Sequence, residues 1–310
     1  MRVLLGVDGS TSSDLAALLV ANLPWPAGST IRVVTAYPGT TDLFYPEGLV
    51  VPAEVVQQAE DAMEAEARSV AIHVARRFAS PDITVQTRIV RERAGTAIIA
   101  EADAFDAELV VVGNRGRGAF EATVLGSVSA EVIDHGGRPV LVARRDHVGR
   151  ILLGEDGSES AAAAAEAIRR WPILHGHGVL VMSVADIDPV WSPWHLGPDL
   201  LDAHDAATSR LHDHHEALAR ATAAGLVEAG IAAESGVVDG SPAHRLVEAA
   251  VSAGVDLIVV GTHGRSGLGR LFLGSVARGV LYNAACSVLI VPTSVPGDNA
   301  TDIPQGAANA

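Results

Sequence analysis

Glycines, serines and aspartates recur in this chain in the same order and at the same spacing, in two copies. One copy of the glycine pattern consists of Gly113, Gly116, Gly126 and Ser127, and the other consists of Gly261, Gly264, Gly274 and Ser275. The offset between the copies is 261 minus 113, or 148 residues, and it also relates Asp8-Gly9-Ser10 to Asp156-Gly157-Ser158. Matched aspartates at one shared offset indicate two related domains that lie end to end.

Each glycine pattern lies between an apolar run and a helical segment, an arrangement that can hold phosphate. Gly113 ends an apolar strand, and Gly126 with Ser127 opens a helix with a favourable N-cap. Glycines let the backbone approach a ligand closely, and the unpaired N–H groups at a helix start favour an anion. Arg117 and Arg265 directly follow the second glycine of each copy and add positive charge. We therefore predict an anion-binding loop in each half.

The basic residues exclude several nucleotide mechanisms. All 22 residues of the Lys+Arg total are arginine, so the chain contains no lysine. A P-loop, a kinase site and a Schiff base each need a lysine amine, which this chain cannot supply. The formal net charge of -15 also argues against a nucleic-acid partner, because phosphate backbones are bound by clustered basic side chains.

The remaining composition favours a reducing compartment. Cys286 is the single cysteine, which excludes an internal disulfide and a cysteine-built metal site, and its place at the start of an apolar strand indicates burial. No apolar stretch approaches the ~20 residues of a membrane helix, so we expect a cytoplasmic protein without a membrane partner. The histidines His204, His212, His214 and His215 lie close together, but nothing fixes a metal geometry. We expect a solvated helix face and predict no metal site.

Alternating strand and helix patterns indicate an α/β fold in each half. The 310 residues make two domains of about 150 residues, a common size for one core. Hydrophobic residues are 48% of the chain and aromatic residues 4%, which suits helices that cover buried parallel strands. We predict two tandem open-sheet domains, each a five-stranded parallel sheet of order 3-2-1-4-5 with helices on both faces. The predicted domains are residues 1–146 and 147–294, and a flexible tail follows over 295–310.

The strand ends near Asp8 and Gly113 would be neighbours if the strand order were 3-2-1-4-5. Ligands of open α/β sheets bind beyond the carboxyl ends of the strands, at the point where the strand order reverses. The aspartate and the glycine loop of each half would therefore face one crevice. A dinucleotide is not expected there, because the pattern GxGxxG appears in neither loop.

Several segments resemble the universal stress proteins of the ATP-binding type, in the tandem form with two domains in one chain. In the first half they are GVDGS at Gly6 to Ser10 and VVVGNRGRGAFEATVLGS at Val110 to Ser127. In the second half they are LLGEDGS at Leu152 to Ser158 and LIVVGTHGRSGLGRLFLGS at Leu257 to Ser275. The resemblance covers Met1 to about Thr293, and the second copy is the closer match.

The resemblance implies one adenine-nucleotide site in each domain, with ATP, alone or with Mg²⁺, as the ligand. In such proteins the aspartate after the first strand and the end of the second strand hold adenosine, and the glycine loop with the following helix holds the phosphates. Carried over to this sequence, site one consists of Gly6, Asp8, Ala36, Gly113, Asn114, Arg115, Gly116, Arg117, Gly118, Gly126, Ser127 and Val128. Site two consists of Gly154, Asp156, Val184, Gly261, Thr262, His263, Gly264, Arg265, Ser266, Gly267, Gly274, Ser275 and Val276.

The two halves differ at positions that bear on these sites. Arg115 stands where His263 fits the usual histidine of the family, and Glu155 replaces the apolar Val7 beside the aspartate. We expect the two sites to differ in affinity. The segment 91–95 also differs from its counterpart, but we expect it to seat a helix and to touch no ligand.

Two functions remain open for the pair of sites. One is a nucleotide-dependent regulatory module of a stress response, and the other is a slow ATP-hydrolysing or nucleotide-transferring enzyme. The sequence favours the first, because no activated nucleophile with a paired base is visible. We name no catalytic residue and expect at most a weak ATPase. The signal and the protein partner stay open.

The fifth strands, at Pro139 to Ala143 and Ser287 to Val291, would lie at sheet edges. Exposed edges need a cover, because their free N–H and C=O groups invite pairing. The resemblance implies that these edges pair within the chain as an internal pseudo-dimer, and it leaves a further homodimer open.

Overall fold

The computed structural model spans residues 1–310 and describes all of them except 40–50, 79, 117–124, 188–197, 263–272 and 294–310. Residues 198–201 are described for their backbone alone. The predicted tail over 295–310 and the middle of each glycine loop therefore lie outside the described residues.

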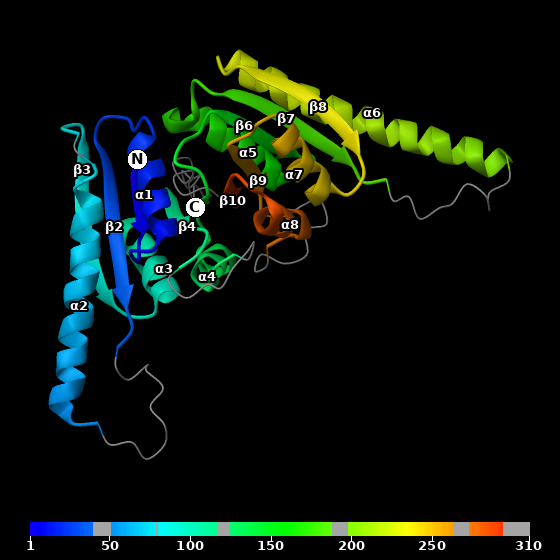
Figure 1. Ribbon diagram of the computed structural model, residues 1–310. Coiled ribbons are helices and arrows are strands. Elements are labelled where there is room, and N and C mark those ends of the chain that lie inside the picture. The colour runs from blue at the N-terminus through cyan, green and yellow to red at the C-terminus, as the bar shows by residue number, and fades with distance from the viewer. Residues whose placement is uncertain (40–50, 79, 117–124, 188–197, 263–272, 294–310) are drawn as a thin grey trace, which may run out of the picture.

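Both halves consist of alternating strands and helices (Figure 1). The first half contains β1 (Arg2–Gly6), α1 (Thr11–Asn22), β2 (Ser29–Tyr37), α2 (Ala53–Ala75), β3 (Ile83–Arg91), α3 (Ala94–Phe105), β4 (Leu109–Gly113), α4 (Ser127–His135) and β5 (Val140–Ala143). The second half contains β6 (Arg150–Glu155), α5 (Glu159–Arg170), the short 3₁₀ helix η2 (Pro172–Leu174), β7 (Gly178–Ala185), α6 (Pro198–Glu228), β8 (Ala233–Asp239), α7 (Pro242–Ser252), β9 (Leu257–Gly261), α8 (Ser275–Asn283) and β10 (Ser287–Val291).

The Asp-Gly-Ser motif makes the first turn of each half. Gly9 and Gly157 have φ values of 76° and 78°, in the left-handed region that glycine adopts without a steric penalty. Ser10 and Ser158 cap α1 and α5 by accepting hydrogen bonds from backbone N–H groups three residues later, at 3.2 and 3.1 Å. The motif therefore follows the strand and starts the helix in the same way in both halves.

All ten strands form one sheet of order β3-β2-β1-β4-β5-β10-β9-β6-β7-β8. Each half has parallel neighbours and the order 3-2-1-4-5, which confirms the predicted fold class. The halves join through β5 and β10, which pair antiparallel with Leu141 opposite Leu289. The predicted internal pairing of the two fifth strands is thus confirmed, and it leaves β3 and β8 as the outer strands.

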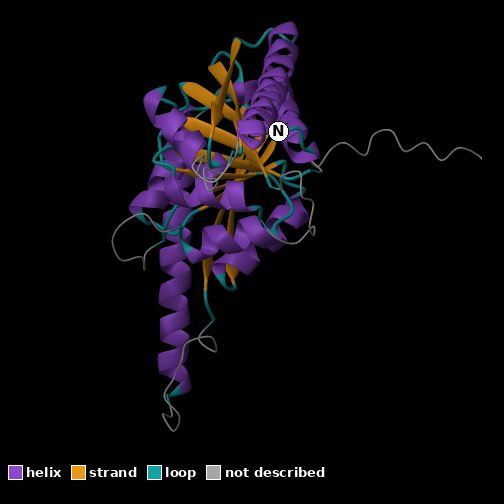
Figure 2. Ribbon diagram, turned by 90° about the vertical axis from the view of Figure 1, so that its right-hand side faces the viewer, coloured by secondary structure: helices purple, strands orange, loops and turns teal. Residues whose placement is uncertain are grey.

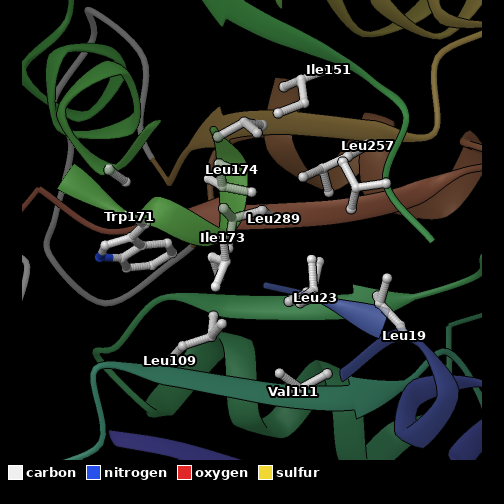
Figure 3. Packing of buried hydrophobic residues seen from close by; sticks show 14 of the residues in the cluster. Leu19, Leu23, Leu109, Val111, Ile151, Trp171, Ile173, Leu174, Leu257 and Leu289 are labelled. Carbon is white, nitrogen blue, oxygen red and sulfur yellow. The ribbon is translucent and has the colours of Figure 1, made fainter. Parts of the chain in front are cut away.

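Helices cover both faces of the sheet and enclose two cores. One core lies under α1, α2, α5 and α6, and the other lies under α3, α4, α7 and α8. Figure 3 shows part of the first core, where Leu23 of the first half lies near Ile173 and Leu289 of the second half. Each fully buried aliphatic side chain contributes roughly 1.5–3 kcal/mol to stability. Because both cores contain residues of both halves, the two halves stabilise one another.

The helices α2 and α6 are much longer than the strands they cover and extend past the sheet at opposite ends of the molecule (Figure 1, Figure 2). The buried residues of α2 are Ala67, Ala71 and Val74, all toward its C-terminal end. The N-terminal part of α2 therefore projects from the body. No described helix combines the length and the apolar content needed to cross a membrane.

Candidate functional site

A cavity of about 620 Å³ lies in the first half, where β1 and β4 are neighbours and their carboxyl ends meet. This is the point where the strand order reverses, as predicted for a ligand crevice. The cavity is lined by Gly6, Val7, Asp8, Ser13, Val34, Ala36, Ala94, Ile98, Val112, Gly113, Arg115, Gly116, Leu125, Gly126, Ser127, Val128 and Ser129. The structure therefore brings the aspartate, the second-strand end and both described ends of the glycine loop to one cavity.

Asp8 is held in place by its own turn and faces the glycine loop. Its Oδ1 accepts a hydrogen bond from the backbone N–H of Ser10 at 3.0 Å. Its Oδ2 lies 2.9 Å from where a Cβ on Gly116 would stand. A side chain at position 116 would therefore push on the carboxyl group of Asp8. The φ angle of Gly116 lies outside the left-handed range, so space, and not backbone strain, requires glycine there.

The two ends of each glycine loop are joined by a backbone hydrogen bond. The N–H of Gly126 donates to the carbonyl of Asn114 at 2.7 Å, and the N–H of Gly274 donates to the carbonyl of Thr262 at 2.7 Å. In the first half Ser12 of α1 supports the loop as well, because its Oγ donates to Oδ1 of Asn114 at 2.7 Å. The two loops therefore share the same closed base.

The helix after the loop begins at Ser127, as predicted, and its N-cap is a glycine. Gly126 is the N-cap of α4 and Ser127 is the first helical residue, so no side chain caps this helix. The same holds for Gly274 and Ser275 at α8. A serine inside the first turn cannot reach the N–H groups that an N-cap residue satisfies. The uncapped N–H groups of α4 stay available to a ligand in the cavity.

Some glycines assigned to the sites serve packing. A Cβ on Gly113 would lie 2.6 Å from Oγ of Ser12 and 2.7 Å from its backbone, so β4 and α1 can meet only over a glycine. Gly261 makes the same close contact with Ser160 on α5. Gly6 and Gly154 likewise face the helices α3 and α7 across gaps too small for a Cβ to enter freely. Sequence spacing alone could not separate these glycines from those at the loop.

The described residues of the second half repeat the arrangement seen in the first half. The described members of predicted site two are Gly154, Asp156, Val184, Gly261, Thr262, Gly274, Ser275 and Val276. Asp156 repeats the turn of Asp8, because its Oδ1 accepts from the N–H of Ser158 at 3.0 Å. Other predicted members lie outside the described residues, namely Arg117 and Gly118 of site one and His263, Gly264, Arg265, Ser266 and Gly267 of site two.

A buried polar cluster distinguishes the second half. The carboxyl group of Glu155 accepts from the N–H of Gly157 at 2.7 Å and from the hydroxyl of Thr222 at 2.8 Å. Ser183 donates to the carbonyl of Glu155 at 2.6 Å and lies 2.7 Å from Nδ1 of His215. His215 is 5% exposed, so the predicted solvated face is wrong for this histidine. The cluster joins β6 and β7 to α6.

The other residues that the sequence singled out fall in ordinary surroundings. His212 pairs with Asp239 at 2.9 Å, and this hydrogen bond raises the pKa of His212. Among the described residues, no group of three or more His, Cys, Asp or Glu side chains could hold a metal ion. Cys286 is buried, as predicted, and burial raises the pKa of its thiol.

Apolar wall residues of the cavity were missed from the sequence. Val34, Ile98 and Val112 line it, together with Ala94 at the start of α3. The segment 91–95 was expected to lie away from the ligand, yet Ala94 borders the cavity. The sequence places these residues only in predicted strands and helices. That does not distinguish a residue of the core from a residue of the cavity wall.

The fold and this site define a class of protein with two tandem α/β domains and a cavity at the switch point of the sheet. A profile described as the Universal stress protein family matches residues 1–144 and again residues 147–292. The chain therefore belongs to the universal stress protein family.

Full-length relatives share the tandem arrangement. Universal stress protein Rv2005c of Mycobacterium tuberculosis is 31% identical over 319 residues, which covers 94% of this chain and 97% of that relative. A universal stress protein of Mycolicibacterium smegmatis is 30% identical over 302 residues, which covers 93% and 96%. The crystal structure of a universal stress protein from Archaeoglobus fulgidus superposes with a TM-score of 0.63 at 17% identity, covering 94% of this chain and 98% of that chain. The last comparison supports the fold.

Proposed function

We propose that this protein binds an adenine nucleotide in each half and acts as a nucleotide-dependent regulatory module of a stress response. One observation carries the proposal. The carboxyl group of Asp8, the described ends of the glycine loop and the uncapped start of α4 border one cavity at the sheet switch point. The lone cysteine suits action in a reducing compartment such as the cytoplasm.

The cavity has the size and the lining that an adenine nucleotide needs. Its volume of about 620 Å³ lies inside the range of roughly 300–1,000 Å³ of small-molecule sites. Apolar side chains such as Ile98 and Val112 suit a base, and Asp8 supplies an acceptor for its amino group or for ribose hydroxyls. Arg115, Gly116 and the N–H groups of α4 suit phosphate. The bound nucleotide would supply a charge that depends on its number of phosphates, which a regulatory protein can use as a signal.

Binding without efficient catalysis is the function that the described groups support. Ser13 and Ser129 line the cavity, and their hydroxyl groups donate to the carbonyls of Ser10 and Gly113 at 2.9 and 2.7 Å. A serine nucleophile needs its proton to face a base. These two hydroxyl protons instead hold α1 and α4 in place, so we propose no hydrolytic role for them.

The second site carries the same proposal with a different affinity. Asp156 and the closed loop base at Gly274 repeat the geometry of the first half. Ala277 stands where Ser129 holds α4 to β4, so the start of α8 lacks this tie. A less firmly held helix start is less preorganised for phosphate. We therefore expect the second site to bind ATP more weakly than the first.

Two measurements test nucleotide binding. Mass spectrometry of protein purified without added nucleotide asks whether ATP, AMP or nothing is carried along. A thermal melt with ATP, GTP and NADH tests selectivity, because a ligand held by the folded state stabilises it by about 4 kcal/mol per site at a thousandfold excess over Kd. ATP should raise the melting temperature most. Equal or absent shifts for all three compounds would contradict an adenine-nucleotide site.

A further inference from the structure

A second, smaller pocket lies between the two halves, beside the proposed nucleotide cavity. Its volume is about 260 Å³. Asn114, Arg115 and Arg144 of the first half line one side, and Tyr282 and Ala284 of the second half line the other. Arg115 also lines the larger cavity, so this residue borders both, and its charge acts on that of Arg144. The pocket exists only because β5 and β10 bring the halves together.

Two arginines meet in this pocket without an acidic partner. Among the described residues, no carboxyl group lines the pocket, and neither Arg115 nor Arg144 forms an ion pair there. Most other described arginines do pair with carboxyl groups, as Arg138 and Arg150 do. Two like charges in a partly buried place cost free energy unless an anion compensates them. Although the protein has a net charge of -15, its described residues leave these two cations without an ion-pair partner.

Arg144 is fixed in place by contacts that do not neutralise it. Its guanidinium group donates to the backbone carbonyls of Leu281 and, at 3.3 Å, Cys286. Its own N–H donates to Oγ of Ser287 at 3.0 Å. Burial and the nearby Arg115 charge lower the pKa of Arg144 to about 10, so the side chain stays charged at neutral pH. Arg144 is therefore a positioned cation with N–H groups left over.

The remaining polar groups of the pocket can donate as well. Oδ1 of Asn114 accepts from Ser12, which leaves its Nδ2 amide without an acceptor in the described part of the structure. Tyr282 is 39% exposed, and its hydroxyl group has no partner among the described residues. The polar groups of the pocket that have no described partner are arginine N–H groups, an amide and a phenol hydroxyl, and all of them can donate hydrogen bonds. Such a set of donors suits an oxyanion, and the planar guanidinium group of arginine suits phosphate in particular.

The equivalent positions in the other half of the chain do not carry this set of donor side chains. The offset of 148 residues places Pro292 at the position equivalent to Arg144, and Asp134 at the position equivalent to Tyr282. Asp134 lies 3.8 Å from the guanidinium of Arg278, so the charge on that side is already balanced. The donor set is therefore a property of one side of the pseudo-dimer, and the fold alone does not explain it.

We propose that this interdomain pocket binds a phosphate-type oxyanion between Arg115 and Arg144, with Tyr282 as a third donor. The oxyanion is either free phosphate or the terminal phosphate of a nucleotide in the neighbouring cavity. Because its contacts come from both halves, the anion stabilises their junction. Free phosphate binding does not depend on the proposed nucleotide function.

Isothermal titration of the full chain with inorganic phosphate and pyrophosphate, at constant ionic strength, tests the proposal. Wild type should bind one anion per chain in this pocket. Arg144→Gln should weaken binding about tenfold or more, since hydrogen bonds to charged groups contribute about 1.5–3 kcal/mol. Arg144→Lys should fall between the two, and Tyr282→Phe should weaken binding less. Arg145→Gln is the matched control, because Arg145 is the exposed neighbour and does not line the pocket.

The same titrations separate the two sources of phosphate. If the anion is free, phosphate still binds when ATP is present in excess. If it belongs to a nucleotide, ATP but not adenosine abolishes phosphate binding, and Arg144→Gln weakens ATP but not adenosine. Either result supports the pocket. The proposal is overturned if folded Arg144→Gln binds phosphate, pyrophosphate and ATP as wild type does, or if Arg145→Gln has the same effect. Absence of ATP binding to wild type contradicts the nucleotide function alone.

Discussion

The carboxyl group of Glu155 accepts a hydrogen bond from the hydroxyl group of Thr222 at 2.8 Å, at positions where the first half has Val7 and Val74. The end of the first strand and the helix that covers it are therefore joined by a polar contact in the second half. In the first half the two equivalent residues are both part of the apolar core. Glu155 is 7% exposed and directly precedes Asp156, so this contact helps to fix the backbone at the proposed second site.

This pair predicts strong coupling between two substitutions. Thr222→Val should destabilise the protein by about 1–3 kcal/mol, because it leaves a buried carboxyl group short of a donor. The double variant Glu155→Val with Thr222→Val recreates the apolar pair of the first half and should cost less than the sum of the single variants. A urea-unfolding double-mutant cycle measures this. Additivity within about 0.5 kcal/mol would show that the contact carries no coupling.

The glycines of the site should separate into two groups. Gly113→Ala should lower stability by about 1–3 kcal/mol, because its Cβ would stand 2.7 Å from the backbone of Ser12. Gly116→Ala should weaken ATP binding with a smaller loss of stability, because among the described residues its Cβ would meet the Asp8 side chain and no backbone. Gly178→Ala is the control, since no described residue comes within 4 Å of its Cβ position. Equal losses for all three variants in urea unfolding would refute this division.

The ion pair of His212 and Asp239 predicts a pH dependence of stability. The hydrogen bond from Asp239 raises the pKa of folded His212 above the usual 6.5. A raised folded pKa contributes stability that is fully present below about pH 6.5 and is lost as the pH rises through the folded pKa. Because the pair is exposed, the contribution should stay below about 1 kcal/mol.

The variant His212→Gln checks this sign. Its loss of unfolding free energy relative to wild type should be larger at pH 5.5 than at pH 8. A larger loss at pH 8 than at pH 5.5 would reverse the expected sign.

The junction of the halves should fail when its ladder is broken. Val140 pairs with Ile290, and Val288 pairs with Val142, across the antiparallel contact of β5 and β10. Proline at 140 or 288 removes a ladder donor in the middle of a sheet and should separate the halves or lower the melting temperature sharply. Val140→Ala keeps the donor and is the control. Small-angle scattering and melting curves that match wild type for both proline variants would contradict the junction.

The fold could be read from the sequence because each local signal agreed with the others. The repeated Asp-Gly-Ser turns, the strand-ending glycines and the alternating helical segments all indicated parallel strands, and the structure has them in the predicted order 3-2-1-4-5 in each half. Side-chain roles were harder to foresee. The helix α4 starts at Ser127 as predicted, but its N-cap is Gly126, which has no side chain to accept a capping hydrogen bond.

The residues of the cavity wall and of the interdomain pocket could not be predicted, because they come together through contacts between segments that are distant in the sequence. Ala94 and Ile98 reach the cavity because α3 lies across the end of β1, which no local pattern states. Arg144 and Tyr282 are 138 residues apart (282 minus 144) and meet only through the β5 and β10 pairing. His215 read as part of a polar helix surface, yet the Ser183 hydroxyl below it makes its burial favourable.

The stoichiometry of ATP binding tests the central claim most directly. Isothermal titration should give two sites for wild type, one for Asp8→Ala, one for Asp156→Ala and none for the double variant, because each aspartate serves its own half. Asp82→Ala, an exposed aspartate in the turn before β3, should keep both sites. Circular dichroism should show that all variants are folded. A folded double variant that still binds two ATP molecules would contradict the assignment of the two sites.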